Sequence, residues 1–202
     1  MGREGFAQVF SLSPTKLVVA GEGGLVATSS PAFAALLCDL REYGNDGDYS
    51  CALAGLNGRL PELSAALGRV SLARLPEVLA RRQATADAYL DVLRGTPGLG
   101  FQAIPAGGAT SWKDLSLTID PDAFGASRDA VRAHLAARGI DSRAYYSPPC
   151  HRMPAFRRFH AAGRPLAVTD SLAACSLSLP MGAHVTPAVA RMVANELLGA
   201  RG

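Results

Sequence analysis

Hydrophobic positions along the chain follow two rhythms: short apolar runs, and longer stretches that repeat about every 3.6 residues. The short runs predict strands at residues 6–10, 17–20, 25–28, 111–119 and 140–146. The first of these strands is expected to be buried. The longer stretches predict helices at residues 31–43, 61 to about 93, 128–138, 156–162, 166–174 and 186 to about 197. Because strands alternate with helices, the pattern is typical of an α/β fold.

Capping residues place several of the predicted helix ends. Ser30, Ser127 and Thr186 each precede a predicted helix, where a hydroxyl can accept a backbone N–H of the first turn. Gly139 follows the helix at 128–138 and is expected to stop it. Pro76 removes a donor inside the longest helical stretch, so we expect a kink or a restart there.

The segment Gly95-Thr-Pro-Gly98 separates two parts of different character. A turn of this composition interrupts a helix and is typical of a boundary between domains. We therefore expect a first domain over residues 1–95 and a second, small α/β domain over residues 96–202.

Composition narrows the class of protein. Hydrophobic residues make up 49% of the chain and the net charge is only +3, with arginines scattered along it, which argues against a nucleic-acid surface. No apolar run reaches the roughly eighteen residues needed to cross a bilayer, and we expect no membrane partner. Four cysteines without paired spacing predict reduced thiols in a cytoplasmic protein, with neither a disulfide framework nor a metal site.

Lys16 is one of only two lysines among 20 basic residues. An arginine stays charged, whereas a lysine amine can lose its proton and form a Schiff base with an aldehyde. Ser11 and Thr15 add hydroxyls, and residues 21–24 predict a tight turn between the strands at 17–20 and 25–28. The alternative is that Lys16 is a solvated charge at the start of a hairpin.

The segment Ser11-Leu-Ser-Pro-Thr-Lys16, followed by Gly-Glu-Gly-Gly at 21–24, resembles the cofactor-lysine segment of the DegT/DnrJ/EryC1/StrS aminotransferases. These are pyridoxal-phosphate enzymes of fold type I. The resemblance implies that Lys16 binds pyridoxal 5′-phosphate as a Schiff base. It also implies that Ser11 is a ligand of the cofactor phosphate.

Two further segments carry the same resemblance. Gly55-Leu-Asn57-Gly-Arg59 is similar to the family's Gly-x-Asn-Tyr-Arg signature, with Gly58 in place of the usual tyrosine, and Leu-Ser-Leu-Pro-Met at 177–181 matches a family segment. By resemblance, Asn57 reaches across a dimer interface to the partner subunit's cofactor phosphate. From the residues alone, Asn57 could equally be a turn residue and Arg59 a surface charge.

A Tyr-rich turn with two prolines precedes His151, and this arrangement also resembles the family. The prolines favour a fixed position that faces a substrate. The resemblance assigns His151 no role, and a structural or surface histidine is the alternative reading.

The resemblance covers only the C-terminal half of the family's usual length. It therefore implies the end of a large cofactor-binding domain with dimer-forming helices over 1–95, and the small domain over 96–202. The implied activity moves an amino group from glutamate or glutamine to a keto-sugar, expected to be nucleotide-linked, in a homodimer. Lysine at position 16 favours transamination over the family's dehydratases, which carry histidine there.

The groups that tune the cofactor in such enzymes lie upstream of the lysine, outside this sequence. Two readings therefore stay open. The chain could belong to a complete aminotransferase whose missing N-terminal half is supplied elsewhere, or it could be a catalytically incomplete fragment or helper subunit.

Overall fold

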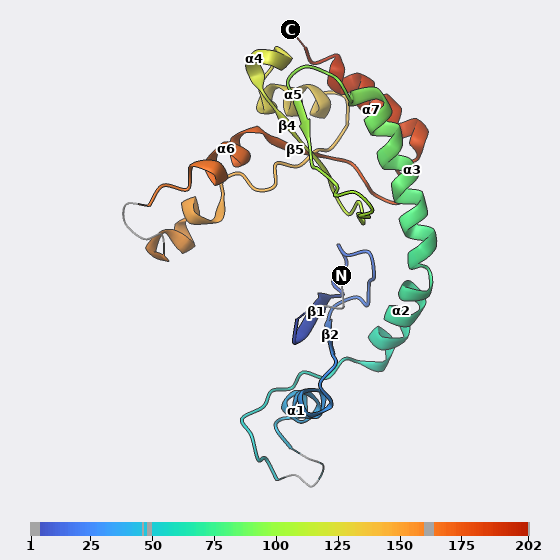
Figure 1. Cartoon of the computed structure of the whole chain (residues 1–202), viewed down its shortest axis with the longest axis vertical. Coiled ribbons are helices and arrows are strands. Elements are labelled where there is room, and N and C mark those ends of the chain that lie inside the picture. Colours follow the sequence, from blue (N-terminus) through green and yellow to red (C-terminus); the bar gives the residue numbers. More distant parts are fainter. Residues whose placement is uncertain (1–4, 46, 48–49, 160–163, 202) are drawn as a thin grey trace. The chain divides into compact units, whose positions relative to one another are not determined.

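The computed structural model describes residues 5–45, 47, 50–159 and 164–201. The chain divides into two compact units, Met1–Val78 and Leu79–Gly202 (Figure 1). This division falls within helix α3 (Leu75–Leu93), upstream of the boundary expected at residues 95–98. The assignment of domains to 1–95 and 96–202 stays a prediction. In the described part of the chain, no helix is long and apolar enough to cross a membrane.

The first unit opens with a two-stranded antiparallel sheet of β1 (Ala7–Ser11) and β2 (Gly24–Thr28). The register sets Ala7 opposite Thr28 and Ser11 opposite Gly24. The strand predicted at 25–28 is confirmed, but it pairs with β1 because the strand predicted at 17–20 does not form. The tight turn predicted at 21–24 is therefore wrong, and a loop over residues 12–23 joins the strands.

Residues 17–20 do not form a strand because their backbone groups are bonded elsewhere. The Ala20 N–H donates to the Leu12 carbonyl at 2.9 Å, and the Val19 N–H donates to Ser71 Oγ at 2.9 Å. Ser71 lies on helix α2 (Glu62–Ala73). A hydroxyl 52 positions away thus takes the donor that a strand ladder would have used.

The strand predicted at 6–10 forms as β1, but the expectation that it is buried is wrong. Val9 is 77% exposed and Phe10 is 41% exposed. A sheet of two strands has no inner strand, and only a second layer can cover its faces. In this unit that layer is helix α1 (Pro31–Arg41), where the ring of Phe33 meets the ring of Phe6 at 4.8 Å.

The predicted helix ends are largely confirmed in the first unit. Ser30 Oγ accepts the Phe33 N–H at 3.3 Å and caps α1. Helix α2 ends at Ala73, and α3 begins at Leu75, so the chain restarts its helix at Pro76 as expected. Proline fits there because the first turn of a helix needs no donor from its N–H.

The second unit contains a three-stranded antiparallel sheet in the order β3 (Leu99–Phe101), β4 (Leu115–Ile119) and β5 (Ser176–Leu179). The strand predicted at 111–119 starts only at Leu115, because Trp112 takes a positive φ of 45°. The strand predicted at 140–146 does not form; Arg143 alone bridges to Ser178. Strands β3 and β5 were not predicted.

The described part of this unit also contains the helices α4 (Pro121–Phe124), α5 (Arg128–Ala136), α6 (Ala167–Cys175) and α7 (Pro187–Leu198). It contains two short 3₁₀ helices as well, η1 (Cys150–Arg152) and η2 (Pro154–Phe159). Ser127 Oγ caps α5 by accepting the Ala130 N–H at 3.2 Å. Thr186 Oγ1 caps α7 in the same way at 3.3 Å. The helix predicted at 156–162 is 3₁₀ up to Phe159, and 160–162 lie outside the described residues.

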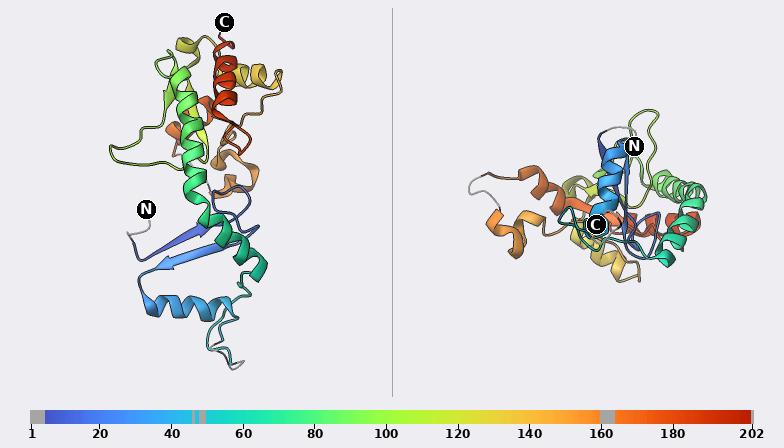
Figure 2. Two further views of the ribbon diagram at one scale, coloured as in Figure 1. Left: turned by 90° about the vertical axis from the view of Figure 1, so that its right-hand side faces the viewer. Right: turned by 90° about the horizontal axis from the view of Figure 1, so that it is seen from below.

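One hydrophobic core joins α3, α5 and α7 to the sheet of the second unit, and α3 runs beside α7 (Figure 2). On β4, Leu115, Leu117 and Ile119 alternate with less buried residues, so one face of the strand enters the core. The phenol of Tyr89 donates to the Pro180 carbonyl at 3.0 Å, and burial raises the pKa of Tyr89. The paired hydroxyl allows this large side chain to be fully buried.

Candidate cofactor site

Lys16 lies in the loop over residues 12–23 and is half-buried. Its backbone N–H donates to the Ser13 carbonyl at 3.0 Å, which closes a turn around Pro14. No ion pair joins Lys16 to any other residue that the structure describes. The second lysine, Lys113, differs because its Nζ lies 2.6 Å from Asp114 Oδ2. Of the two lysine amines, that of Lys16 therefore forms no ion pair with a carboxylate among the described residues.

The loop that carries Lys16 is anchored at both ends and against α2. The Leu12 N–H donates to the Gly23 carbonyl at 2.9 Å, and Leu12 and Ala20 are the buried apolar residues of the loop. Gly68 of α2 faces Ala20 so closely that a Cβ at Gly68 would lie 3.3 Å from the Ala20 Cβ. Glycine at this position therefore lets the helix and the loop approach each other.

Ser11 ends β1, five positions before Lys16, and is exposed. Its Oγ lies 3.4 Å from Ser13 Oγ. Two hydroxyls thus lie at the entry of the lysine loop. The Ser11 hydroxyl donates to Ser13 Oγ, and by rotating about its C–O bond it can donate to an anionic oxygen instead. Ser11 and Lys16 belong to one anchored segment of the first unit, as the sequence predicts.

Asn57 lies in the loop between α1 and α2, in a cluster that also contains Glu42, Tyr43 and Arg59. Asn57 Oδ1 accepts the Arg59 Nε–H at 3.2 Å, and Arg59 Nη1 pairs with Glu42 Oε1 at 3.0 Å. The Arg59 guanidinium also lies over the Tyr43 ring, 5.4 Å from its centre. Sequence reasoning missed Glu42 and Tyr43, because nothing in the local pattern links them to a motif that begins twelve or more positions later, at Gly55.

Gly55 begins the motif of Asn57 for a steric reason. A Cβ at Gly55 would collide with the backbone of Tyr43 and Gly44. The Gly55 position therefore lets two loop segments touch, and this contact sets Asn57 beside Glu42. The aromatic ring that the resemblance expects at position 58 is absent, and Tyr43 provides the ring beside Arg59 instead.

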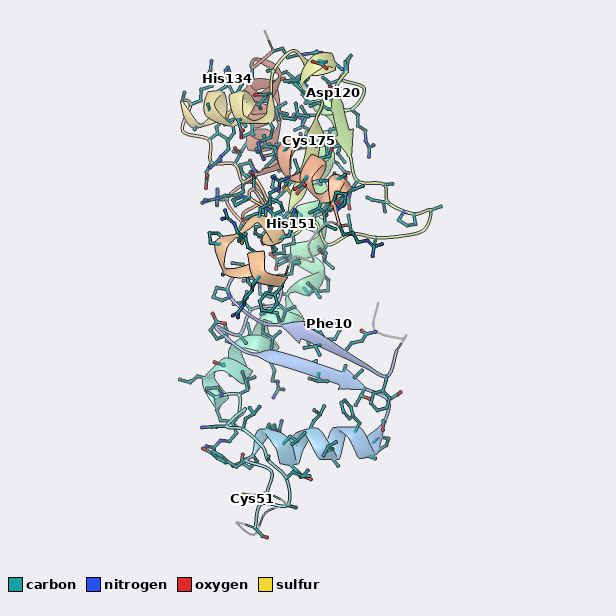
Figure 3. All side chains as sticks on the ribbon, turned by 90° about the vertical axis from the view of Figure 1, so that its left-hand side faces the viewer. Phe10, Cys51, Asp120, His134, His151 and Cys175 are labelled. Atoms are coloured by element: carbon teal, nitrogen blue, oxygen red, sulfur yellow. The ribbon has the colours of Figure 1, made fainter. Side chains whose placement is uncertain are left out.

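His151 lies in the second unit on η1 and is labelled in Figure 3. Its Nε2 is 3.0 Å from Asp170 Oδ1, and Arg152 binds the same carboxylate through Nε at 2.6 Å and Nη2 at 2.7 Å. The hydrogen bond from Arg152, followed by the charges of Arg152 and His151, lowers the pKa of Asp170 despite its partial desolvation. His151 is therefore held in a fixed position by a residue of α6.

The residues of the lysine loop fit pyridoxal phosphate by their chemistry. The cofactor offers an aldehyde that an amine can hold and a phosphate that hydroxyls and backbone N–H groups can bind. Lys16 supplies the amine and Ser11 supplies a hydroxyl on one anchored segment of the chain.

The comparisons with known proteins agree with this chemistry. A model of the DegT/DnrJ/EryC1/StrS aminotransferase family matches residues 1–198. The mixed α/β fold and the solved neighbours define part of a fold-type-I pyridoxal-phosphate-dependent transferase. The chain belongs to the DegT/DnrJ/EryC1/StrS aminotransferase family, and the predicted resemblance and fold class are confirmed.

Three similar proteins illustrate the match. The dTDP-3-amino-3,4,6-trideoxy-alpha-D-glucose transaminase of Streptomyces venezuelae is 37% identical over 177 residues, which is 87% of this chain and 45% of that protein. The crystal structure of S. venezuelae DesV in complex with a ketimine intermediate has a TM-score of 0.89 and 34% identity, covering 98% of this chain and 52% of that one. The structure of DesI in the presence of its TDP-sugar product has a TM-score of 0.85 and 36% identity, covering 98% and 50%.

The chain spans about half the length of these relatives. This fraction agrees with the prediction that the resemblance is to one half of the family's usual length.

Proposed function

We propose that the chain forms the lysine-bearing half of an aminotransferase that moves an amino group from glutamate or glutamine to a nucleotide-linked keto-sugar. The observation that carries the proposal is Lys16, a half-buried residue on a loop anchored to α2, whose amine forms no ion pair among the described residues. Family membership supports the reaction class. The names of a transaminase for a dTDP-linked sugar and of DesI with its TDP-sugar product support the substrate class.

Each residue has a proposed task. Lys16 holds the aldehyde carbon of pyridoxal phosphate through its amine and, when displaced, moves a proton between the substrate α-carbon and the C4′ carbon of the cofactor. Ser11 donates its hydroxyl hydrogen to the cofactor phosphate. Asn57 serves the same phosphate in the partner subunit of a homodimer. The bound cofactor itself supplies an electron-withdrawing ring that accepts electrons from the reacting carbon.

The test is chemical labelling of the lysine. Borohydride reduction in the presence of pyridoxal phosphate, followed by peptide mapping, should place a pyridoxyl group on Lys16 in the chain completed by its upstream half. Lys16→Ala and Lys16→Arg should both abolish the label, because a guanidinium keeps its charge and forms no imine. Lys113→Ala is the matched control and should leave the label in place. A label on Lys113, or turnover by Lys16→Arg, would contradict the proposal.

A second candidate is a catalytically incomplete fragment or helper subunit. The exposed apolar side chains of β1 and β2 are compatible with it, because α1 leaves Val9 of β1 77% exposed and Leu25 of β2 50% exposed. The DNA immediately upstream separates the two candidates. An in-frame continuation that encodes the other half supports the complete enzyme, whereas a stop codon without a separate gene for that half supports the fragment.

A further inference from the structure

We propose that the second unit carries a binding cavity for a small aromatic carboxylate. The cavity has a volume of about 160 Å³, and its walls come from α3, β3, β4 and the loop between the two strands. Every residue that lines it belongs to Leu79–Gly202, so one unit contains the whole cavity. This inference goes beyond the proposed aminotransferase function and does not depend on it.

Trp112 forms one wall in a backbone conformation that bulky residues rarely adopt. Its φ is 45°, and the residue is only 3% exposed. A side chain of this size in the left-handed region is a genuine outlier. Such residues persist only where the surroundings hold them, and they cluster at ligand clamps and active sites. The conformation of Trp112 is therefore the first sign that this place binds a ligand.

Two side chains of α3 hold Trp112 in place. Arg82 Nη1 donates to the carbonyls of Trp112 at 2.7 Å and Lys113 at 3.1 Å. The indole Nε1–H donates to Gln83 Oε1 at 2.8 Å. Burial lowers the pKa of Arg82, consistent with a guanidinium that has left water to bind this loop. Because the indole N–H is already bonded, Trp112 offers the cavity an apolar ring.

The apolar walls and the volume suit a single aromatic ring. Leu90 of α3, Phe101 of β3 and Leu115 of β4 line the cavity together with Trp112. A cavity of roughly 150 Å³ lined by leucine, isoleucine and phenylalanine holds one benzene molecule in another protein. Aromatic side chains also pack favourably against a further ring at 4.5–7 Å. The space therefore fits a ligand with one ring.

The polar residues that line the cavity indicate that the ligand carries a negative charge. Arg94, in the turn that follows α3, lines the cavity, is exposed, and has no ion pair with any residue that the structure describes. A guanidinium matches the fork of a carboxylate with two parallel hydrogen bonds. Ser116, which lines the cavity, has its Oγ 2.6 Å from Ser178 Oγ; when Ser178 is the donor of this pair, the hydroxyl hydrogen of Ser116 is available to a ligand. A ring that bears a carboxylate meets all of these groups.

Trp112 is the only tryptophan of the chain, so its fluorescence reports on the cavity directly. Titration of the full chain with benzoate should change this fluorescence saturably. Benzamide has the same shape without the charge and should bind at least about tenfold more weakly, since hydrogen bonds to charged groups are the stronger ones. Acetate has the charge without the ring and should give no saturable change.

Arg94→Gln should weaken benzoate binding by at least about tenfold. Arg132→Gln removes an exposed arginine of α5 that does not line the cavity, and it should bind benzoate as the unaltered chain does. Equal affinity for benzoate and benzamide, an unchanged response in Arg94→Gln, or no saturable response to benzoate would each overturn the proposal. If Arg94→Gln does not fold, the comparison of benzoate with benzamide in the unaltered chain still tests whether the cavity prefers a charged carboxylate.

Discussion

The two units bury their apolar side chains to very different extents. In Leu79–Gly202, a continuous core joins α3, α4, α5 and α7 to a three-stranded sheet. In the described residues of Met1–Val78, Leu12 and Ala20 are the buried apolar residues, while several leucines and valines of β1, β2 and α2, together with Phe10, are exposed. An apolar sequence therefore does not guarantee a core; a second layer must also cover it.

The same contrast separates the two candidate sites. The lysine loop is anchored by hydrogen bonds and by Ala20 against α2, in the unit with few buried side chains. The aromatic cavity borders the packed core of the other unit. We therefore expect the shape of the cavity to depend on packing in the core, and the conformation of the lysine loop to depend on the hydrogen bonds that anchor it.

The largest expected effect comes from opening the core of the second unit. Leu117→Ala removes a side chain that is 1% exposed and should lower the free energy of unfolding by about 2–5 kcal/mol. Leu63→Ala on α2, where the side chain is 87% exposed, should change it by less than about 0.5 kcal/mol. Chemical denaturation followed by far-ultraviolet circular dichroism, which reports on the helices of both units, measures both losses. Equal losses in the two variants would show that the units do not differ in packing.

Self-association should be the next effect in size. Exposed apolar strands with free edges promote association, so the isolated chain should form soluble oligomers or aggregates in light scattering. Val9→Lys places a charge on β1, where Val9 is 77% exposed, and should reduce the association. Val168→Lys on α6, where Val168 is 75% exposed, is the control and should leave it unchanged. A monodisperse, cooperatively melting monomer of the unaltered chain would contradict this prediction.

The smallest expected effect is the pH dependence of the contact between η1 and α6. Because Arg152 lowers the pKa of Asp170 in the folded chain, the carboxylate stabilises the fold above its unfolded pKa of about 3.9. This contribution should be lost as the pH falls below about 4 through the lower folded value. Asp170→Asn should therefore destabilise the chain at pH 6 and approach the unaltered chain near pH 3 in thermal unfolding.

Asp91→Asn on α3 is the control for this measurement, because Asp91 forms no ion pair in the described part of the chain. Its difference from the unaltered chain should not vary with pH over the same range. A difference for Asp170→Asn that is equally large at pH 3 and pH 6 would show that the contact acts by packing rather than by charge.

Helix positions were predictable because their signals are local. A hydroxyl at Ser30, Ser127 or Thr186 bonds an N–H three positions away, so the cap and its partner lie in one short window of sequence. The restart at Pro76 follows from the missing donor of a single residue. The lysine segment was recognisable for the same reason, since Ser11 and Lys16 lie only five positions apart.

What only the tertiary structure decided rests on partners that are far apart in the sequence. The apolar run at 17–20 satisfies every local rule for a strand, yet Ser71 and Leu12 take its backbone groups. Residues 140–146 do not form a strand, because among them only Arg143 makes a bridge to β5. Trp112 lies outside β4 because hydrogen bonds from Arg82 and to Gln83 of α3 hold it in another conformation. The sequence alone therefore located most of the longer helices and their caps, and it singled out Lys16 as a candidate, because neighbours along the chain define these features. The strands, the cluster around Asn57 and the aromatic cavity needed the fold, because hydrogen bonds and packing between distant residues create them.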